Sequence, residues 1–599
     1  MARLGQVLRE AREKKGCSWQ EIEAATGLWP EYAQALERED PGKFASAGHF
    51  RSALRLYARY LGLDVREVFG LWERAASGPE QERGEGRAGG TGTAYRMVVA
   101  GLVISLSLAI CGITGLYAYR WLRGLGGTDE GLFGGWPGGN GPSASPSVLP
   151  SPTPYSPISS TSVPRYVITA TVDYEGHSLA VQQRIDYANR SGQTLSNVVL
   201  NVFPNHQPEL FALNQLSLEF GTGPIGATPT LEGMALYVPL PQNLEPGRVT
   251  TLFMEYTLQL PYIDPQDSFT SGAFGWSEKV LDLGHWYPAM APQMPDVGWR
   301  ALGYHPVGDP YVMEEADYDV RIYAPEGVTV VGGGELEREG NLWHYRLPQA
   351  RSFGFAASDQ YVSSSTESAG VTVTSYYFAE HEDAGLDVAR FAGEALELFE
   401  GEFGMPYPYA EYRVAETEFA GGMEFSGLAF LGALWYETYP GGVRSQLVAL
   451  LVHEVSHQWW YGLVGNDQVS EPWLDEALAT YSELLFYRLR YPDDHLWAWD
   501  FEVFNRQPAG MIDGSIYDFA DQASYMNAVY RRGAIFLGDL RQLIGEQEFR
   551  QFLQDYAQTQ AHTVSTGADF FSILSGHTDK DVSPLLEEYF SQPPGEGSR

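Results

Sequence analysis

Cysteine is almost absent from this chain of 599 residues, which contains only Cys17 and Cys111. Neither lies in the large C-terminal part, so that part has no disulfide framework and no thiolate metal site. Any metal ion bound there must therefore be held by histidine and carboxylate side chains.

Basic residues are scarce in the same part of the chain. Residues 135–599 carry 22 basic and 60 acidic side chains, and the formal net charge of the whole chain is −37. Such a field repels phosphate backbones and anionic lipid, and it favours cationic ligands such as the free amines of peptides. The composition argues against nucleic-acid binding by the C-terminal part.

One long segment has no charge at all. Residues 97–119 are uncharged over 23 positions, which at 1.5 Å per residue is enough to cross a hydrocarbon core of ~30 Å. The segment begins too far from the N-terminus for a signal peptide and lacks a cleavage pattern, so we expect an uncleaved transmembrane helix. Its length and lack of charge disfavour the alternative, a buried helix of a soluble domain.

Composition and periodicity divide the rest of the chain. Residues 77–96 and 120–164 are rich in Gly, Ser, Thr and Pro and predict linkers, the second stiffened by proline. Residues 165–370 alternate in short apolar runs separated by turns, which predicts an all-β sandwich or saddle domain. Residues 371–590 change to helical spacing, with strands expected near 412–418 and 428–432, and 591–599 form a tail.

Residues 1–76 predict an all-α helix-turn-helix bundle. Ser18 is placed to cap a helix and Gly27 lies at the expected turn. The segment resembles the cytoplasmic domain of membrane-anchored bacterial helix-turn-helix proteins that attach to the actin-like cytoskeleton. This resemblance implies a cytoplasmic N-terminus and a cytoplasmic protein partner.

DNA binding is the obvious alternative for such a bundle, but the charges of the expected recognition helix oppose it. Entry into a DNA groove requires Lys and Arg side chains. This helix offers one basic side chain against four acidic ones: Arg38 against Glu31, Glu37, Glu39 and Asp40.

The sequence HEVSH carries the main chemical signal. It places His453 and His457 four residues apart on one face of a helix, with Glu454 beside them. Glu476 follows in a second helical segment and is a candidate third ligand. Two histidines and one glutamate leave one position open for water, as in a catalytic zinc site, whereas a structural zinc is closed by four ligands.

These motifs resemble the aminopeptidase N family of gluzincin metallopeptidases over roughly residues 165–590. Glu476 follows the HEVSH motif at the spacing of the family's third ligand. GGMEF at 421–425 resembles the family's exopeptidase motif, and VYRRG at 529–533 resembles its V-Y-E-K-G stretch. The resemblance implies a thermolysin-like, mainly α catalytic domain with a small mixed sheet, and one zinc ion per chain.

The resemblance also implies a role for each residue. The metal ligands would be His453, His457 and Glu476, and the general base would be Glu454. Tyr530 would donate a hydrogen bond to the transition state. Glu424 would bind the substrate α-amine, next to the substrate-binding residues Gly421, Gly422 and Met423. His285, Trp459 and Trp460 are expected to be packing residues instead.

The chain departs from the family in two respects. Phe425 replaces the usual Asn, and Arg531 and Arg532 replace Glu and Lys. The chain ends about 70 residues after Tyr530, so the family's C-terminal helical domain is missing and we expect a more open cleft.

Together these observations predict a type II, single-span membrane protein whose extracytoplasmic zinc aminopeptidase domain removes the N-terminal residue from peptides. Two alternatives remain at this point. One is a zinc endopeptidase of the same fold, in which Glu424 plays no part in amine recognition. The other is an inert transmembrane scaffold or sensor.

Overall fold

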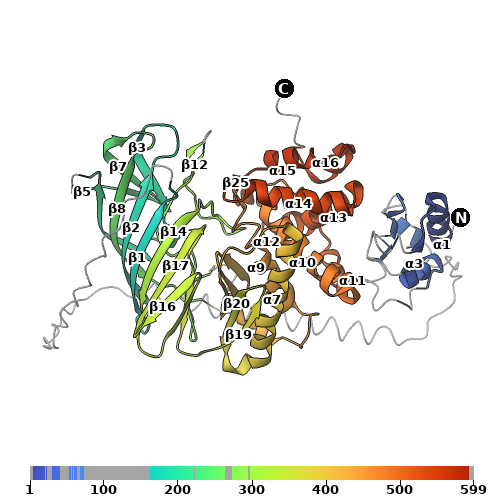
Figure 1. The fold of residues 1–599 in the computed structure, drawn as a ribbon, viewed down its shortest axis with the longest axis horizontal. Coiled ribbons are helices and arrows are strands. Elements are labelled where there is room, and N and C mark those ends of the chain that lie inside the picture. Colours follow the sequence, from blue (N-terminus) through green and yellow to red (C-terminus); the bar gives the residue numbers. More distant parts are fainter. Residues whose placement is uncertain are drawn as a thin grey trace, which may run out of the picture. The chain divides into compact units, whose positions relative to one another are not determined.

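Figure 1 shows the fold of the chain in a computed structural model. The structure describes residues 162–592 except 222, 264–272 and 295–296, and it also describes 4–19, 30–40 and short stretches between 22 and 72. The predicted span 97–119 and almost all of the predicted linkers therefore lie outside the described residues. Across the described ranges we find no helix with both the length and the apolar character that crossing a bilayer requires.

Two of the predicted N-terminal helices are present, α1 (Leu4–Lys15) and α3 (Pro30–Glu37). Glu37 is buried and accepts hydrogen bonds from Arg12 Nε at 2.7 Å and from the Tyr57 hydroxyl at 2.7 Å. One acidic residue of the expected recognition helix therefore faces the core of the bundle rather than solvent.

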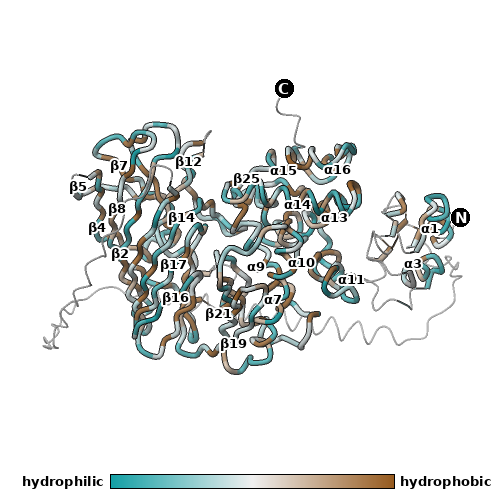
Figure 2. The backbone as a smooth tube through the Cα atoms, viewed as in Figure 1, coloured by the Kyte–Doolittle hydropathy of each residue, from teal (hydrophilic) through white to brown (hydrophobic). Residues whose placement is uncertain are grey.

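In the described residues the β-rich domain contains one large sheet, two smaller sheets and a two-stranded pair, β12 (Gln293–Met294) with β13 (Gly298–Trp299), as the alternating sequence predicted. Along β8 (Val249–Gln259) every second side chain is buried, including Leu252, Met254 and Tyr256, and Figure 2 shows hydrophobic and hydrophilic stretches alternating along such strands. Alternation of this kind buries one face of a sheet. The large sheet has the order β16 (Glu335–Glu339), β17 (Leu342–Ala350), β14 (Ala316–Tyr323), β1 (Arg165–Asp173), β2 (Ser178–Ala188), β8, β4 (Phe211–Glu219) and β5 (Pro224–Gly226).

The two smaller sheets have four strands each. Their strands contribute to the same apolar core as the large sheet. One has the order β11 (Ala289–Met290), β3 (Leu195–Asn201), β7 (Ala235–Leu244) and β6 (Thr230–Glu232), and the other β15 (Thr329–Gly332), β18 (Phe355–Ser358), β10 (Leu281–Leu283) and β9 (Phe274–Trp276).

The catalytic domain begins with a mixed sheet of five strands. β20 pairs in parallel with β21, and β21 pairs in parallel with β23, while β22 runs antiparallel to β23 at the edge. The predicted domain boundary at residue 370 lies inside this sheet, because antiparallel pairing joins β19 to β20. The order is β19 (Tyr361–Ser368), β20 (Val371–Phe378), β21 (Glu411–Thr417), β23 (Leu428–Gly432) and β22 (Gly422–Phe425).

Helices make up most of the rest of this domain (Figure 1). α7 packs on β19 and β20, α9 packs on α7 and α10, and α10 packs on α13. Trp459 and Trp460, which follow α9, are fully buried in this core, as expected for packing residues. The helices are α7 (Glu382–Phe403), α9 (Gln446–Ser456), α10 (Trp473–Arg490), α13 (Gly533–Ile544), α14 (Glu546–Gln560), α15 (Gly567–Leu574) and α16 (Ser583–Tyr589).

A buried arginine joins the β-rich domain to the catalytic domain. Arg351 follows β17 and is 1% exposed. Its Nε donates to the Tyr461 carbonyl at 2.6 Å, and its Nη2 donates to the carbonyls of Leu463 and Thr563. The Glu315 carboxylate lies 3.9 Å away. The guanidinium therefore fixes the loop that follows α9.

Candidate active site

Two helix starts position the predicted metal ligands. Ser445 caps α9, because its side chain accepts a hydrogen bond from the Val448 amide at 3.2 Å. His453 and His457 follow one turn apart near the end of this helix. α10 begins after Pro472 and carries Glu476 in its first turn.

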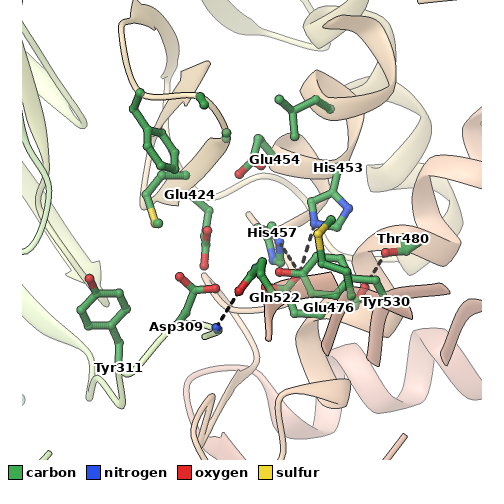
Figure 3. Close-up of a pocket in the computed structure, with 18 of the residues that line it drawn as sticks. Asp309, Tyr311, Glu424, His453, Glu454, His457, Glu476, Thr480, Gln522 and Tyr530 are labelled. Carbon is green, nitrogen blue, oxygen red and sulfur yellow. Dashed lines mark hydrogen bonds and ion pairs between the residues drawn. The ribbon is translucent and has the colours of Figure 1, made fainter. Parts of the chain in front are cut away.

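The three predicted ligands converge on one point (Figure 3). Glu476 Oε2 lies 3.2 Å from His453 Nε2 and 3.5 Å from His457 Nε2, and all three side chains are buried. A tetrahedral zinc ion with bonds of about 2.0–2.1 Å has its ligand atoms roughly 3.4 Å apart. The spacing of these nitrogen and oxygen atoms therefore fits one zinc ion with an open fourth position.

Further contacts orient the two imidazoles. His457 Nδ1 lies 2.8 Å from the Trp460 carbonyl, and His453 Nδ1 lies 4.0 Å from Glu483 Oε2. A donor bond from Nδ1 leaves Nε2 unprotonated and free to bind a metal. Without a metal ion, the imidazoles of His453 and His457 can instead direct an Nε2–H at Glu476. These hydrogen bonds outweigh the effect of burial and lower the pKa of the Glu476 carboxyl to about 2. The third ligand is therefore ionised at neutral pH.

Glu454 lies beside the ligands without being one of them. Its carboxylate is buried, and Oε2 has no hydrogen-bond partner in the described part of the chain. Burial raises the pKa of this carboxyl well above its usual range, which favours its protonated form. Such a group can accept a proton from a metal-bound water, because the cation favours its ionised form.

Two carboxylates lie at one end of the site. Glu424 is on edge strand β22, where Gln468 Nε2 donates to its Oε1 at 3.1 Å. Asp309, from the loop before β14, points towards the same space, as Figure 3 shows. Burial raises the pKa of both carboxyls, and mutual repulsion raises that of Asp309 further. A cationic group between them would relieve this repulsion.

Tyr530 lies on the opposite side of the ligands from Glu424 in Figure 3. It belongs to the π-helical turn η8 (Met526–Arg532), and its ring stacks on the His453 imidazole with centroids 5.6 Å apart and planes at 5°. Because a π-turn inserts one residue into a helix, it changes the direction of the side chains that follow, and such turns are common at functional sites.

One cavity of about 380 Å³ contains all of these groups. A volume of this size suits a small ligand. Its lining includes every predicted site residue: Gly421, Gly422, Met423, Glu424, His453, Glu454, His457, Glu476 and Tyr530.

The sequence analysis missed several residues of this cavity. Asp309 and Tyr311 reach it from the β-rich domain, and Arg506 and Glu502 reach it from the segment after α10. The loops that carry Asp309 and Arg506 show no periodicity or motif. His285, predicted to be a packing residue, is buried and stacks on Tyr311 at 3.5 Å.

The comparisons with known proteins agree with this geometry. Residues 389–589, which hold the ligands, Glu454, Glu424 and Tyr530, match the Peptidase family M1 domain. The match covers 201 of the 599 residues, about a third of the chain. The three convergent side chains are of the ligand types that a zinc ion prefers. Residues 7–68 match a Helix-turn-helix domain, in agreement with the N-terminal prediction.

Curated relatives and solved structures place the M1 domain in context. Aminopeptidase N of Lactobacillus helveticus is 28% identical over 37% of this chain and 28% of its own length. Aminopeptidase N of Lactococcus lactis subsp. lactis is 25% identical over 48% of this chain and 37% of its own length. The chain thus spans only about a third of the curated relatives. An M1 zinc metallopeptidase from Deinococcus radiodurans shares the fold, with a TM-score of 0.53 and 18% identity over 71% of this chain and 93% of the other.

Proposed function

We propose that this protein is a zinc aminopeptidase that removes the N-terminal residue from peptides. One observation carries the proposal: the three convergent ligands and Glu454 share a cavity with two carboxylates, buried Glu424 and half-buried Asp309, at one end. A metal site alone would suit any metallopeptidase. An anionic end of the cavity adds a reason to select a free α-ammonium group.

Each residue has a physical role in this proposal. When bound, zinc polarises the scissile carbonyl and lowers the pKa of a coordinated water towards ~7. Glu454 accepts the proton of that water and passes it to the leaving amine. The Tyr530 hydroxyl donates a hydrogen bond to the oxyanion.

The carboxylates of Glu424 and Asp309 together hold the substrate α-ammonium. Because Glu424 is buried and Asp309 is half-buried, their attraction for a cation is stronger than in water. Fixing the amine at this end leaves the first peptide bond, and no other, at the metal. A related observation comes from a fold neighbour: a Deinococcus radiodurans M1 zinc metallopeptidase binds the substrate Tyr-Ser-Ala.

The proposal also includes the location of the protein. The uncharged run 97–119 would anchor the chain as a type II membrane protein, with residues 1–76 in the cytoplasm and the peptidase outside it. The match to a helix-turn-helix domain supports a cytoplasmic N-terminus. Resistance to alkaline extraction, and digestion of the M1 domain by protease added outside intact cells, would support this arrangement. Release by alkali, or protection of the M1 domain, would contradict it.

The experiment for the activity uses the purified full-length protein and a panel of aminoacyl p-nitroanilides and short peptides, each with a free and an N-acetylated terminus. We expect hydrolysis of the free-amine substrates alone, with loss of activity on chelation and recovery with zinc. Glu454→Gln should abolish turnover while retaining bound zinc, and the exposed Glu437→Gln should behave like the wild type.

Other outcomes would contradict the proposal in different ways. Cleavage of N-acetylated peptides at internal bonds would identify an endopeptidase. Bound zinc without any hydrolysis would favour the scaffold alternative.

A further inference from the structure

The active-site cavity follows one face of α9 from end to end. The residues that line it from this helix recur at intervals of three or four, and together they cover about 16 Å at 1.5 Å per residue. They are Gln446, Leu450, His453, Glu454 and His457. The metal ligands lie at the C-terminal end of this line, and Gln446 lies roughly 10 Å before His453.

The proposed function fixes the direction of a bound peptide along this line. The α-ammonium binds at the end of the cavity near His457, because the Glu424 and Asp309 carboxyls both interact electrostatically with the His457 imidazole. The scissile carbonyl belongs at the ligands. The residues after the scissile bond must therefore run towards Gln446.

Two arginines lie at that far end. Arg506 and Arg531 both line the cavity, next to Glu502. Arg531 Nε donates to the backbone carbonyl of Glu502 at 3.0 Å, and the Gln446 side chain interacts with the Glu502 carboxyl. These contacts connect both arginines to the start of α9.

Neither guanidinium is neutralised by an ion pair. In the part of the chain that the structure describes, no carboxylate oxygen lies within 4.0 Å of Arg506 or Arg531. The second hydrogen bond of Arg531 goes to the neutral amide oxygen of Asn527 at 2.9 Å. Burial lowers the pKa of Arg531, and the nearby carboxyls of Glu502 and Glu483 oppose this shift without forming an ion pair within 4.0 Å.

We infer that Arg506 and Arg531 bind the C-terminal carboxylate of the substrate, so that the enzyme acts on tri- and tetrapeptides with a free C-terminus. The inference rests on the proposed function, which supplies the orientation of the peptide. An extended chain covers about 3.3–3.6 Å per residue. Two or three residues beyond the scissile bond therefore bring the carboxylate into the range of these side chains.

The chemistry suits a carboxylate better than a neutral peptide group. A guanidinium can form two parallel hydrogen bonds to a carboxylate. Arg531 is half-buried and Arg506 is exposed. With an acidic end and a basic end, the cavity matches both charged termini of a short peptide. A long substrate would leave the two arginines without a partner.

The test compares the free acid Leu-Ala-Ala with its C-terminal amide, using the full-length enzyme and leucine p-nitroanilide as a substrate without a C-terminal carboxylate. We expect kcat/KM for the acid to exceed that for the amide by roughly tenfold to a hundredfold, the size of a charge-assisted hydrogen bond. Arg506→Met and Arg531→Met should each reduce this ratio, and the double variant should bring it close to one.

A neighbouring residue provides the control. Arg532 does not line the cavity, because its guanidinium donates to the Glu588 carbonyl and packs over the Tyr589 ring. Arg532→Met should keep both the acid-to-amide ratio and the anilide rate. Titration of the acid and the amide into Glu454→Gln enzyme should give the same preference in Kd, independently of turnover.

A wild-type ratio near one, with active anilide hydrolysis, would overturn the inference and leave the aminopeptidase intact. Equal binding of acid and amide to the Glu454→Gln enzyme would overturn it in the same way. An enzyme that hydrolyses none of the three substrates would instead overturn the proposed function itself.

Discussion

The α-carbon of Gly422 lies against the carboxylate of Glu454. A Cβ atom at position 422 would overlap Glu454 Oε1, so the first residue of β22 limits where the carboxylate of Glu454, the proposed general base, can lie. From the sequence, Gly421 and Gly422 were expected to allow close approach of the substrate. The structure gives Gly422 this additional neighbour, on a helix more than 30 positions later in the chain.

Gly422→Ala should therefore displace the Glu454 carboxylate and lower kcat, by roughly 10²-fold or more if proton transfer is lost. Zinc content, measured by metal analysis, should not change, because no ligand moves. Gly401→Ala is a matched control in α7, where an added Cβ meets nothing within 4 Å. It should keep full activity and increase stability by about 0.5–1 kcal/mol. Wild-type kcat in Gly422→Ala would contradict this relationship.

Tyr530→Phe should lower kcat by roughly 10²–10³-fold with little change in KM, because the lost hydrogen bond is made to the oxyanion rather than to the substrate. The ring would keep its stacking on His453, so the fold and the metal should persist. Steady-state kinetics on leucine p-nitroanilide measures this effect. The adjacent Tyr525→Phe, whose side chain does not line the cavity, should retain wild-type kcat. A large rise in KM for Tyr530→Phe would assign the hydroxyl to substrate binding instead.

Glu424→Gln and Asp309→Asn should each lower kcat/KM for substrates with a free amine by roughly tenfold to a hundredfold. The double variant should lose less than the product of the two, because both groups hold one ammonium. Measuring kcat/KM of the wild type, both single variants and the double variant on one free-amine peptide gives the coupling free energy between Glu424 and Asp309. Strict additivity would show that Asp309 acts apart from Glu424.

We expect the Glu416 carboxyl to make the folding stability of the protein depend on pH. It is fully buried, lies 2.6 Å from His381 Nδ1 and accepts the Phe378 amide. Burial raises its pKa to about 8 from an ordinary value of 4.5. Between these two pH values the folded state binds a proton that the unfolded state has released. The contribution of Glu416 to the free energy of unfolding is therefore fully present below pH 4.5 and is lost as the pH rises through 8.

The measurement is chemical denaturation of the wild type and Glu416→Gln between pH 5 and 9. Burial lowers the pKa of His381, which gives a slope of opposite sign, so the difference between the two proteins is the informative quantity. The variant should gain stability relative to the wild type as pH rises. The exposed Glu335→Gln should show a constant difference, and a constant difference for Glu416→Gln would contradict the assignment.

The sequence could single out the candidate metal ligands because their signals are local. His453 and His457 are one helical turn apart, and the segment carrying Glu476 shows helical periodicity. Asp309 could not be predicted in the same way. It lies more than 100 residues before Glu424 in an irregular loop, and only tertiary packing brings the two carboxylates together.

The boundary between the two domains also depends on contacts between residues far apart in the sequence, which local patterns do not reveal. β19 alternates like the strands of the β-rich domain, and nothing in its own residues indicates which sheet it joins. The parallel pairing of β20 with β21, across the whole of α7, decides that question. The sequence did show that Arg531 replaces an acidic residue of the family motif, but its position beside Arg506 depends on the π-turn and on the segment after α10.

Arg351 has a consequence for the order in which the protein is assembled. Its side chain joins carbonyls at positions 461, 463 and 563, and β24 (Gly465–Asn466) pairs with β25 (Val564–Ser565) at the same place. During synthesis the histidines of α9 leave the ribosome about 100 residues before Thr563. The loop beside them can therefore make its contacts with residues 563–565 only after that later segment has been synthesised.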